Sequence, residues 1–305
     1  MGKRGYGVDL NDSGKTLTKS ELMEVFSKYD GIITMIYDKI DEDVIRAASG
    51  NLKIIANFAV GFDNIDVLSA KKRGVVVANT PGVASQSVAE HTMTLILACQ
   101  KKLIEADRYV RSGKFEKWDP LLFLSSQVFE KTIGIVGLGS IGMAVGQMAH
   151  QGFKMKIFYN DIVRSEDFEM ITGAKFVGLE TLLSSSDIVT LHVPLTNKTH
   201  HLIDKKELAL MKKTAIIVNT SRGSVVNQDT LVWALTNGII AGAGLDVFEH
   251  EPKVGHELMT LPNVVLTPHI GSATFETREA TAKIAAENII AVFEGKTPFG
   301  LVKVS

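Results

Sequence analysis

Three glycines with a regular spacing stand near the middle of the chain. Gly137, Gly139 and Gly142 follow the apolar run TIGIV and open a stretch with helical character. In a strand–turn–helix context the first glycine permits a tight turn, the second lets backbone N–H groups approach a pyrophosphate, and the third lets the helix pack closely on the strand. The positive end of that helix would face the phosphates. The pattern predicts a dinucleotide site, against the alternative of a turn that serves packing alone.

An acidic residue, Asp161, ends the next predicted strand. It lies about twenty residues after the turn, where a carboxylate accepts hydrogen bonds from the ribose hydroxyls of a dinucleotide. A carboxylate there also repels a 2′-phosphate, so NAD is predicted and NADP is the second choice. Arg164, close by, weakens that preference because its charge could attract the phosphate. The alternative for Asp161 is a turn residue.

Several titratable residues come just after predicted strands in the second half of the chain: His192, Arg222, Asp246, Glu249, Glu251 and His269. Ligands of open parallel sheets bind beyond the carboxyl ends of the strands. We therefore expect several of these side chains to share one cleft, although they lie far apart in the sequence.

Three of these residues suit the transfer of a hydride to a carbonyl. His269 can donate a proton to the developing alkoxide near neutral pH. Arg222 offers a bidentate fork to a substrate carboxylate, and Glu251 would favour the protonated imidazole and orient it. Taken singly, each could be a surface turn, a solvated loop residue or a structural histidine. His192 is interpreted as structural, because His-Val-Pro suggests a backbone segment that runs past the cofactor.

Seven apolar runs must position these residues. Each is almost continuously apolar, as strands covered on both faces must be, and segments such as 141–151 and 229–237 can form helices between them. The runs cover 132–137, 156–160, 174–178, 187–193, 215–220, 242–247 and 263–268. They predict an α/β fold with a doubly wound parallel sheet, a Rossmann NAD domain.

The first part of the chain has a weaker α/β pattern. Its strand candidates are 31–37, 52–58 and 74–80, and two long helices are expected at about 85–111 and 273–294. We predict a smaller, flavodoxin-like substrate domain formed by residues 1–100 and 274–305. The dinucleotide-binding domain, 101–273, would be inserted into it, with the two long helices crossing between the domains.

The composition excludes several classes of protein. The net charge of −1 gives no general attraction to nucleic acid, and no stretch approaches twenty apolar residues. One cysteine, Cys99, excludes an internal disulfide and a multi-cysteine metal site. The first residues lack the apolar core of a secretory signal. We expect a cytoplasmic protein that binds neither nucleic acid nor membranes and needs no metal for its chemistry.

Seven motifs in order resemble the D-isomer-specific 2-hydroxyacid dehydrogenase family, most closely its glyoxylate/hydroxypyruvate reductase group. They are NFAVGFDNID (57–66), VANTPGV (77–83), GIVGLGSIG (134–142), HVPLT (192–196), NTSRGSVVNQDTL (219–231), GLDVFEHEP (244–252) and TPHIGS (267–272). The resemblance implies NAD(H)-dependent reduction of small 2-oxo acids, such as glyoxylate and hydroxypyruvate, to D-2-hydroxy acids. It implies that Arg222, Glu251 and His269 form the catalytic set.

The resemblance also implies binding roles. Backbone N–H groups at Val60 and Gly61, with Asn57 beside them, would bind the substrate together with Arg222. A neighbouring subunit would place Trp118 in the pocket, which implies a homodimer. The cofactor would be held by the glycine turn and Asp161 and, in addition, by Ser140, Ile141, Pro194, Thr199, Thr220 and Asp246.

Two departures from the family pattern stand out. Residues 1–20 are rich in glycine and charge where family members begin with a strand and a helix, which suggests a shortened N-terminus. His250 replaces a more usual proline beside Glu251. Two alternatives remain: a family enzyme for D-lactate, 2-ketogluconate or phosphoglycerate, and a non-catalytic, NADH-sensing binding module of the corepressor kind.

Overall fold

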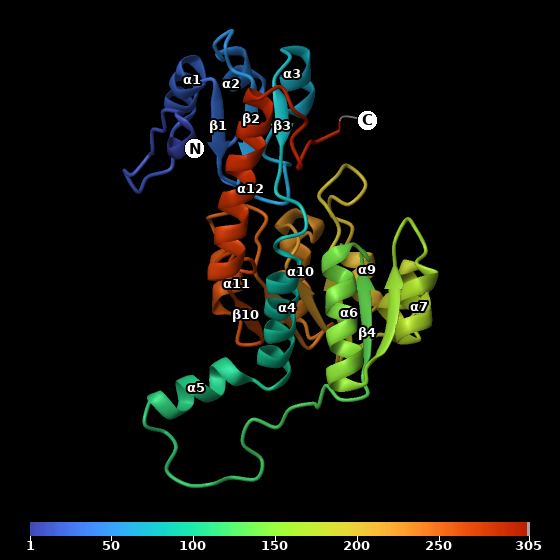
Figure 1. Ribbon diagram of the computed structural model, residues 1–305. Helices are drawn as coiled ribbons and strands as arrows, with labels where there is room; N and C mark the ends of the chain where they lie inside the picture. Colours follow the sequence, from blue (N-terminus) through green and yellow to red (C-terminus); the bar gives the residue numbers. More distant parts are fainter. Residues whose placement is uncertain (304–305) are drawn as a thin grey trace. The chain divides into compact units, whose positions relative to one another are not determined.

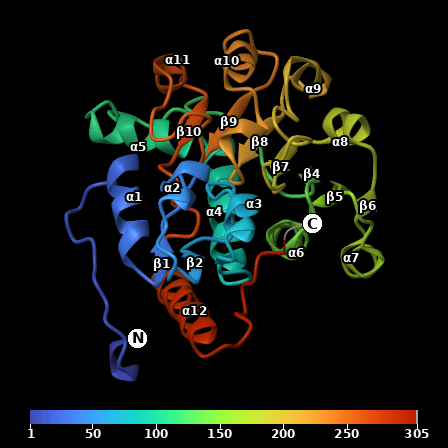
Figure 2. The ribbon, with the colours of Figure 1, turned by 90° about the horizontal axis from the view of Figure 1, so that it is seen from above.

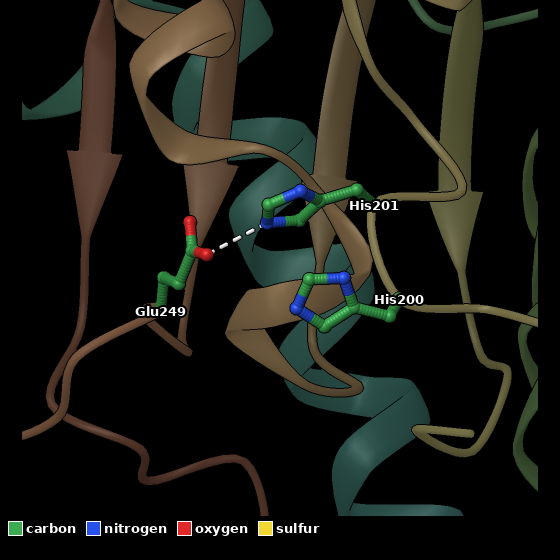
Figure 3. A group of neighbouring side chains, drawn as sticks. All are labelled: His200, His201 and Glu249. Carbon is green, nitrogen blue, oxygen red and sulfur yellow. Dashed lines mark hydrogen bonds and ion pairs between the residues drawn. The ribbon is translucent and has the colours of Figure 1, made fainter. Parts of the chain in front are cut away.

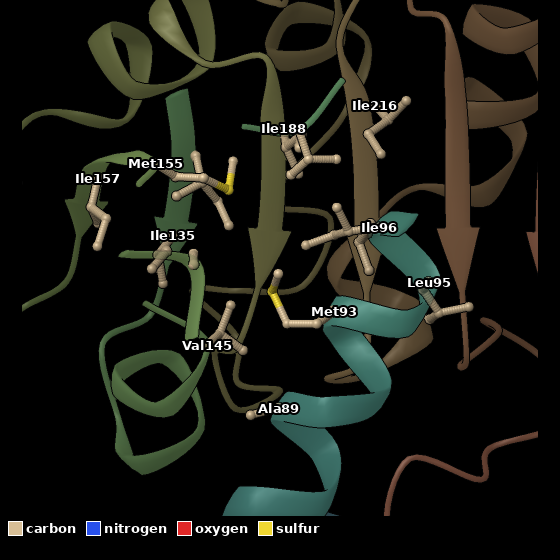
Figure 4. Close-up of a cluster of buried hydrophobic side chains, with 14 of the residues drawn as sticks. Ala89, Met93, Leu95, Ile96, Ile135, Val145, Met155, Ile157, Ile188 and Ile216 are labelled. Carbon is tan, nitrogen blue, oxygen red and sulfur yellow. The ribbon is translucent and has the colours of Figure 1, made fainter. Parts of the chain in front are cut away.

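The computed structural model describes residues 1–303 and divides the chain into two compact units (Figure 1). Unit 1 contains Met1–Ala84 and the chain from Thr274 onwards, and unit 2 contains Ser85–Ala273. The first boundary therefore falls before helix α4 (Ser85–Gln100), whereas the sequence analysis placed it after residue 100. The reason is packing: Leu95 and Ile96 of α4 are buried in the same apolar cluster as Ile135 and Ile216 of the large sheet (Figure 4).

Unit 2 is built on seven parallel strands in the order β10-β9-β8-β7-β4-β5-β6. Read from β4, this is the doubly wound arrangement, whose strand order reverses between β4 and β7. The predicted parallel sheet is thus confirmed, with one short edge strand, β6. The strands are β4 (Thr132–Val136), β5 (Lys156–Asn160), β6 (Lys175–Phe176), β7 (Ile188–Leu191), β8 (Ile216–Asn219), β9 (Gly242–Leu245) and β10 (Val264–Leu266).

Helices cover both faces of this sheet (Figure 2). Because side chains alternate along a strand, Ile188 packs into the cluster that contains α4 and α6, whereas Val189 packs into the cluster that contains α8, α9 and α10. Both faces are buried, which explains the continuous apolar runs. The helices are α6 (Ser140–Phe153), α7 (Glu166–Thr172), α8 (Leu179–Ser185), α9 (Lys205–Leu210), the 3-10 helix η2 (Gly223–Val225), α10 (Gln228–Thr236) and α11 (His256–Thr260).

The helix predicted at 85–111 is two helices. Lys102 has a left-handed backbone, with φ of 52°, so α4 ends before it and α5 (Leu103–Arg111) begins after it. α5 buries none of its residues, and it continues into an irregular segment that extends away from the rest of unit 2 (Figure 1). We call α5 and this segment, residues 103–127, the arm.

Unit 1 has a three-stranded parallel sheet in the order β1-β2-β3, which confirms its three predicted strands. Its first helix, α1, was not predicted, although the sequence carries its signals: Thr18 and Glu21 form a capping box, and Leu22 and Phe26 are buried one turn apart. No helix within residues 1–303 combines the length and apolar character needed to cross a bilayer. The elements are η1 (Gly2–Arg4), α1 (Lys19–Lys28), β1 (Gly31–Thr34), α2 (Glu42–Arg46), β2 (Ile54–Asn57), α3 (Val67–Lys72), β3 (Val76–Ala78) and α12 (Phe275–Phe293).

Candidate active site

The glycine turn joins β4 to α6 at the point where the strand order reverses. Gly137 has φ of 93°, and a Cβ there would lie 2.8 Å from the carbonyl carbon of His192. A Cβ on Gly142 would collide with the carbonyl oxygen of Gly137, whereas a Cβ on Gly139 would meet nothing within 4 Å. Gly137 and Gly142 are therefore required by packing, and Gly139 borders open space.

The start of α6 has the properties of an anion site. No side chain caps its N-terminus at Gly139, so the N–H groups of Ser140, Ile141 and Gly142 have no intrahelical acceptor. Ser140 also accepts a hydrogen bond of 2.9 Å from the hydroxyl of Ser85. Open space over Gly139 and a row of N–H groups at a positive helix end fit the pyrophosphate of a dinucleotide.

Asp161 lies directly beside the glycine turn. Its Oδ2 accepts from the Leu138 N–H at 2.5 Å, and its Oδ1 accepts from the Ile162 N–H at 2.6 Å. Arg164 makes a bidentate pair with Glu169, at 2.9 and 2.7 Å. Hydrogen bonds from Arg164 and from a tyrosine hydroxyl lower the pKa of Glu169 to about 2, so this carboxylate competes for the arginine at any ordinary pH. The structure thus weakens the argument that Arg164 attracts a 2′-phosphate.

His269 and Glu251 are brought together from the ends of two adjacent strands. The Nδ1 atom of His269 lies 2.8 Å from Oε2 of Glu251, and Oε1 of Glu251 accepts from the Phe248 N–H at 2.9 Å. Both side chains are about one-third exposed. His269 has φ of 55°, a conformation that non-glycine residues adopt at a cost and that is concentrated at functional sites. The carboxylate engages Nδ1, and Nε2 makes no hydrogen bond within residues 1–303.

Asp246 holds the backbone that carries His269. Its carbonyl accepts from the His269 N–H at 2.8 Å, and its carboxylate accepts from the N–H groups of Ile270 and Gly271, both at 2.8 Å. Thr267 donates to the same carboxylate at 2.6 Å, and His91 lies 3.3 Å from it. Burial would raise the pKa of Asp246, but these hydrogen bonds outweigh it and hold that pKa below its usual range. A buried, ionised carboxylate therefore holds the loop that carries His269.

Arg222 follows β8, the strand next to β9. Its Nη1 atom donates to the carbonyl of Ser221 at 2.8 Å, and the side chain of Asn219 donates to its carbonyl at 2.8 Å. Gly223 lies so close to Phe248 that a Cβ would overlap the backbone there. This close approach packs the turn at Arg222 and Gly223, which we call the arginine turn, against the loop that leads to Glu251. Sequence reasoning missed Gly223, whose only signal is the small residue after Ser-Arg.

The sequence and the fold agree with known enzymes. The family described as "D-isomer specific 2-hydroxyacid dehydrogenase, NAD binding domain" matches residues 93–271. The glyoxylate reductase of Thermococcus litoralis is 47% identical over 306 residues, covering 99% of this chain and 92% of its own. The glyoxylate reductase of Korarchaeum cryptofilum is 49% identical over 299 residues, covering 97% and 90%.

The chain belongs to the D-isomer specific 2-hydroxyacid dehydrogenase family.

Two solved structures of the family share the fold. The D-lactate dehydrogenase of Aquifex aeolicus, complexed with NAD and lactic acid, is 33% identical with a TM-score of 0.82, and the match covers 90% of this chain and 85% of that one. A glyoxylate reductase from Paecilomyes thermophila is 31% identical with a TM-score of 0.85, covering 93% and 88%. The protein is thus an oxidoreductase with an NAD-binding domain, and its reaction is the NAD-dependent reduction of 2-oxo acids.

Other residues assigned to the cofactor lie on neighbouring loops of this dehydrogenase. Thr199 closes the loop after β7, because its hydroxyl donates to the carbonyl of Pro194 at 2.6 Å and accepts from the Thr196 N–H at 2.8 Å. Thr220, after β8, shares a hydrogen bond of 2.9 Å with Thr92 of α4. These loops belong to the same edge of the sheet as the glycine turn, where a dinucleotide would run across the strand ends.

The residues assigned to the substrate carboxylate form a turn after β2 in unit 1. Asn57 is fully buried; its side chain accepts from Thr34 at 2.9 Å and donates to the carbonyl of Gly61 at 2.8 Å. No hydrogen bond among residues 1–303 uses the N–H of Val60 or Gly61. Asn57 therefore holds the turn in place, and the two N–H groups have no acceptor within these residues.

His192 follows β7 and is half-buried as a residue, but both of its ring nitrogens are shielded from solvent. Neither ring nitrogen has a hydrogen-bond partner within the described chain, and burial lowers the pKa of this imidazole to about 3. It is therefore neutral in the folded protein at physiological pH and cannot replace His269 as a proton donor there, which agrees with its structural interpretation.

This burial predicts a pH-dependent stability. In the unfolded chain His192 binds a proton below about pH 6.5, whereas in the folded chain it does so only near pH 3. Stability is therefore complete above pH 6.5 and falls as the pH decreases towards 3, by up to about 1.4 kcal/mol per pH unit. Urea unfolding at pH 6.5 and pH 5 should show a smaller loss in His192→Phe than in the wild type. An equal loss of unfolding free energy in the two proteins would contradict the conclusion that His192 is neutral in the folded chain.

Proposed function

We propose that this enzyme reduces glyoxylate, and with it hydroxypyruvate, using NADH. The observation that carries the proposal is the pair of His269 and Glu251, 2.8 Å apart, which follow the adjacent strands β10 and β9. Strand β9 in turn lies next to β8, which Arg222 follows. Relatives that share 47% and 49% of their residues with this chain are named glyoxylate reductases. A small 2-oxo acid offers the carbonyl and the carboxylate that these three side chains suit.

The roles follow from the chemistry of each group. The nicotinamide, when bound, would supply the hydride to the carbonyl carbon. His269 would protonate the carbonyl oxygen through Nε2 while Glu251 holds Nδ1 and stabilises the positive charge before transfer. Arg222 would bind the carboxylate and polarise the carbonyl. Val60 and Gly61 would donate backbone N–H groups to the same carboxylate, and the product would be a D-2-hydroxy acid where the carbon is chiral.

A substrate panel tests this proposal. The loss of NADH absorbance is followed with glyoxylate, hydroxypyruvate and pyruvate, and each assay is repeated with NADPH. We expect the highest kcat/KM with glyoxylate and NADH. A clear preference for pyruvate would make the enzyme a lactate-forming member of the family. No turnover on any 2-oxo acid, with NADH binding intact, would overturn the proposal in favour of a sensing role.

Asp161 should determine the choice of cofactor. Its carboxylate lies beside the glycine turn, and Arg164 is engaged by Glu169. Replacing Asp161 with Ser should remove the repulsion of a 2′-phosphate and raise the ratio of kcat/KM for NADPH to that for NADH by roughly tenfold to a hundredfold, since one unscreened like-charge contact is worth a few kcal/mol at most. The double variant D161S/E169Q should raise it further by releasing Arg164. An unchanged ratio in both variants would contradict this role.

We also propose that the enzyme is a homodimer formed through the arm. Its apolar side chains are exposed in the single chain, including Trp118 at 78% and Leu121 at 72%. Such a set on one extension is typical of an interface. Light scattering should give about twice the chain mass of 33.2 kDa. Leu121→Asp should shift the mass towards the monomer, whereas Ile162→Asp, at a position that is 99% exposed outside the arm, should not.

Trp118 is assigned to the substrate pocket of the partner. Trp118→Ala should therefore raise KM for the acid while the mass stays that of a dimer and the Kd for NADH is unchanged. An unaltered KM would leave Trp118 as an interface residue alone.

The composition of the chain is the basis for proposing the cytoplasm as its location. Fractionation of cells, with an antibody to the chain, would test this proposal.

A further inference from the structure

Two adjacent histidines and a glutamate gather outside the residues assigned to hydride transfer. His200 and His201 lie in the loop between β7 and α9, and Glu249 lies in the loop after β9 (Figure 3). Each offers one ligand atom, and the three atoms lie within 4.8 Å of one another. Among the residues that the structure describes, this is the one group of at least three histidine, cysteine or acidic side chains arranged in this way.

The three side chains are held by their surroundings. His201 has φ of 51°, and its backbone N–H donates to the carbonyl of Ser224 at 2.8 Å. Its Nε2 atom lies 2.7 Å from Oε1 of Glu249, whose Oε2 accepts from the Gln228 N–H at 3.1 Å. The ring of His200 lies against that of His201, with centroids 4.0 Å apart. The ligands therefore come from fixed loops, a condition for a preorganised site.

We propose that His200, His201 and Glu249 bind a divalent transition-metal ion of the zinc class. Two imidazole nitrogens and one carboxylate form a ligand set that Zn²⁺ accepts, with a further position for water. Hard cations such as Mg²⁺ prefer all-oxygen sites and are disfavoured here. Binding needs the hydrogen bond between His201 and Glu249 to open slightly so that the ion lies between the two groups.

The position of this site gives the ion a structural effect. Its ligands come from the loop after β7 and the loop after β9, and Gln228 ties Glu249 to the start of α10. Glu251 lies on the same loop as Glu249, and Ser224 lies in η2, two residues after Arg222. An ion here would join segments that carry two catalytic side chains without contacting the catalytic set. No metal is predicted from the sequence, and the proposed metal site does not depend on the proposed reaction.

Metal titration of tag-free protein tests the site. After treatment with EDTA and its removal, the protein is titrated with ZnCl₂ by calorimetry, and we expect one ion per chain. His200→Ala is the preferred variant because the exposed ring of His200 can be removed with little effect on folding. It should weaken Zn²⁺ binding by at least about tenfold, and Glu249→Gln should do the same. His150→Ala, in the last turn of α6, is the matched control and should bind like the wild type.

Two further measurements do not involve activity. Co²⁺ should give a visible d–d absorption band with the wild type and His150→Ala, and the band should be lost in His200→Ala. Zn²⁺ should raise the melting temperature of the wild type, and at the same concentration it should raise that of His200→Ala by less. Equal affinity of His200→Ala and wild type for Zn²⁺ would overturn the proposal, as would the absence of binding to the wild type. His201 and Glu249 would then be a hydrogen-bonded pair alone.

Discussion

Replacing His269 with alanine should lower kcat for glyoxylate reduction by about 10²- to 10⁴-fold, the usual contribution of a positioned general acid. The Kd for NADH should remain close to that of the wild type, because the residues assigned to the cofactor lie on the glycine turn and its neighbouring loops. The physical reason is that the developing alkoxide loses the proton donor that we assign to it. His192 cannot replace that donor, because burial lowers the pKa of His192 to about 3 and keeps its ring neutral. Stopped-flow single turnovers with NADH and fluorescence titration of NADH separate the two quantities.

A second variant keeps this prediction specific. Glu251→Gln preserves a hydrogen bond to Nδ1 of His269 but removes the negative charge that stabilises the imidazolium. The kcat of Glu251→Gln should lie between that of the wild type and that of His269→Ala. The kcat of the double variant should be no lower than that of His269→Ala, because the effects of residues that act as a unit are not additive. Wild-type turnover by His269→Ala would refute the assignment of this histidine.

The residues at the strand ends could be predicted from the sequence because the parallel sheet forces them together. Arg222, Asp246 and His269 each follow a buried apolar run, and parallel strands end at one edge. The apolar runs themselves are readable because both faces of the sheet are covered. The order of the strands, and thus which residues become neighbours, follows from the glycine turn, which identifies β4 as the first strand of a doubly wound fold.

Other features depend on contacts that no local pattern carries. Nothing in the sequence between Leu97 and Leu103 shows that Lys102 adopts a left-handed conformation and divides the long helix. The boundary at Ser85 depends on the packing of α4 against the large sheet. Gly223 is required because the backbone of Phe248, far away in sequence, approaches it. His201 and Glu249 meet across two loops, and neither loop alone predicts the other.

Replacing Arg222 with lysine should be nearly as damaging as removing His269, although the charge is kept. A guanidinium presents donors in a planar fork that matches a carboxylate, whereas an ammonium is a point charge on a flexible stem. In the wild type, the carbonyl of Ser221 already orients the Nη1 atom of Arg222. Losing one or two charge-assisted hydrogen bonds costs about 1.5–3 kcal/mol each, so kcat/KM for glyoxylate should fall by about tenfold to 10⁴-fold.

The division of this loss between kcat and KM tests what Arg222 does. If it binds only the ground-state carboxylate, KM rises and kcat stays constant; if it also polarises the carbonyl, kcat falls as well. We expect both to change, because the arginine turn is seated by Gly223 against the loop that leads to Glu251. Arg222→Ala assayed with added guanidinium should recover part of kcat, whereas Arg222→Lys should not respond. A kcat/KM for Arg222→Lys equal to that of the wild type would show that positive charge alone suffices and that the bidentate geometry has no role.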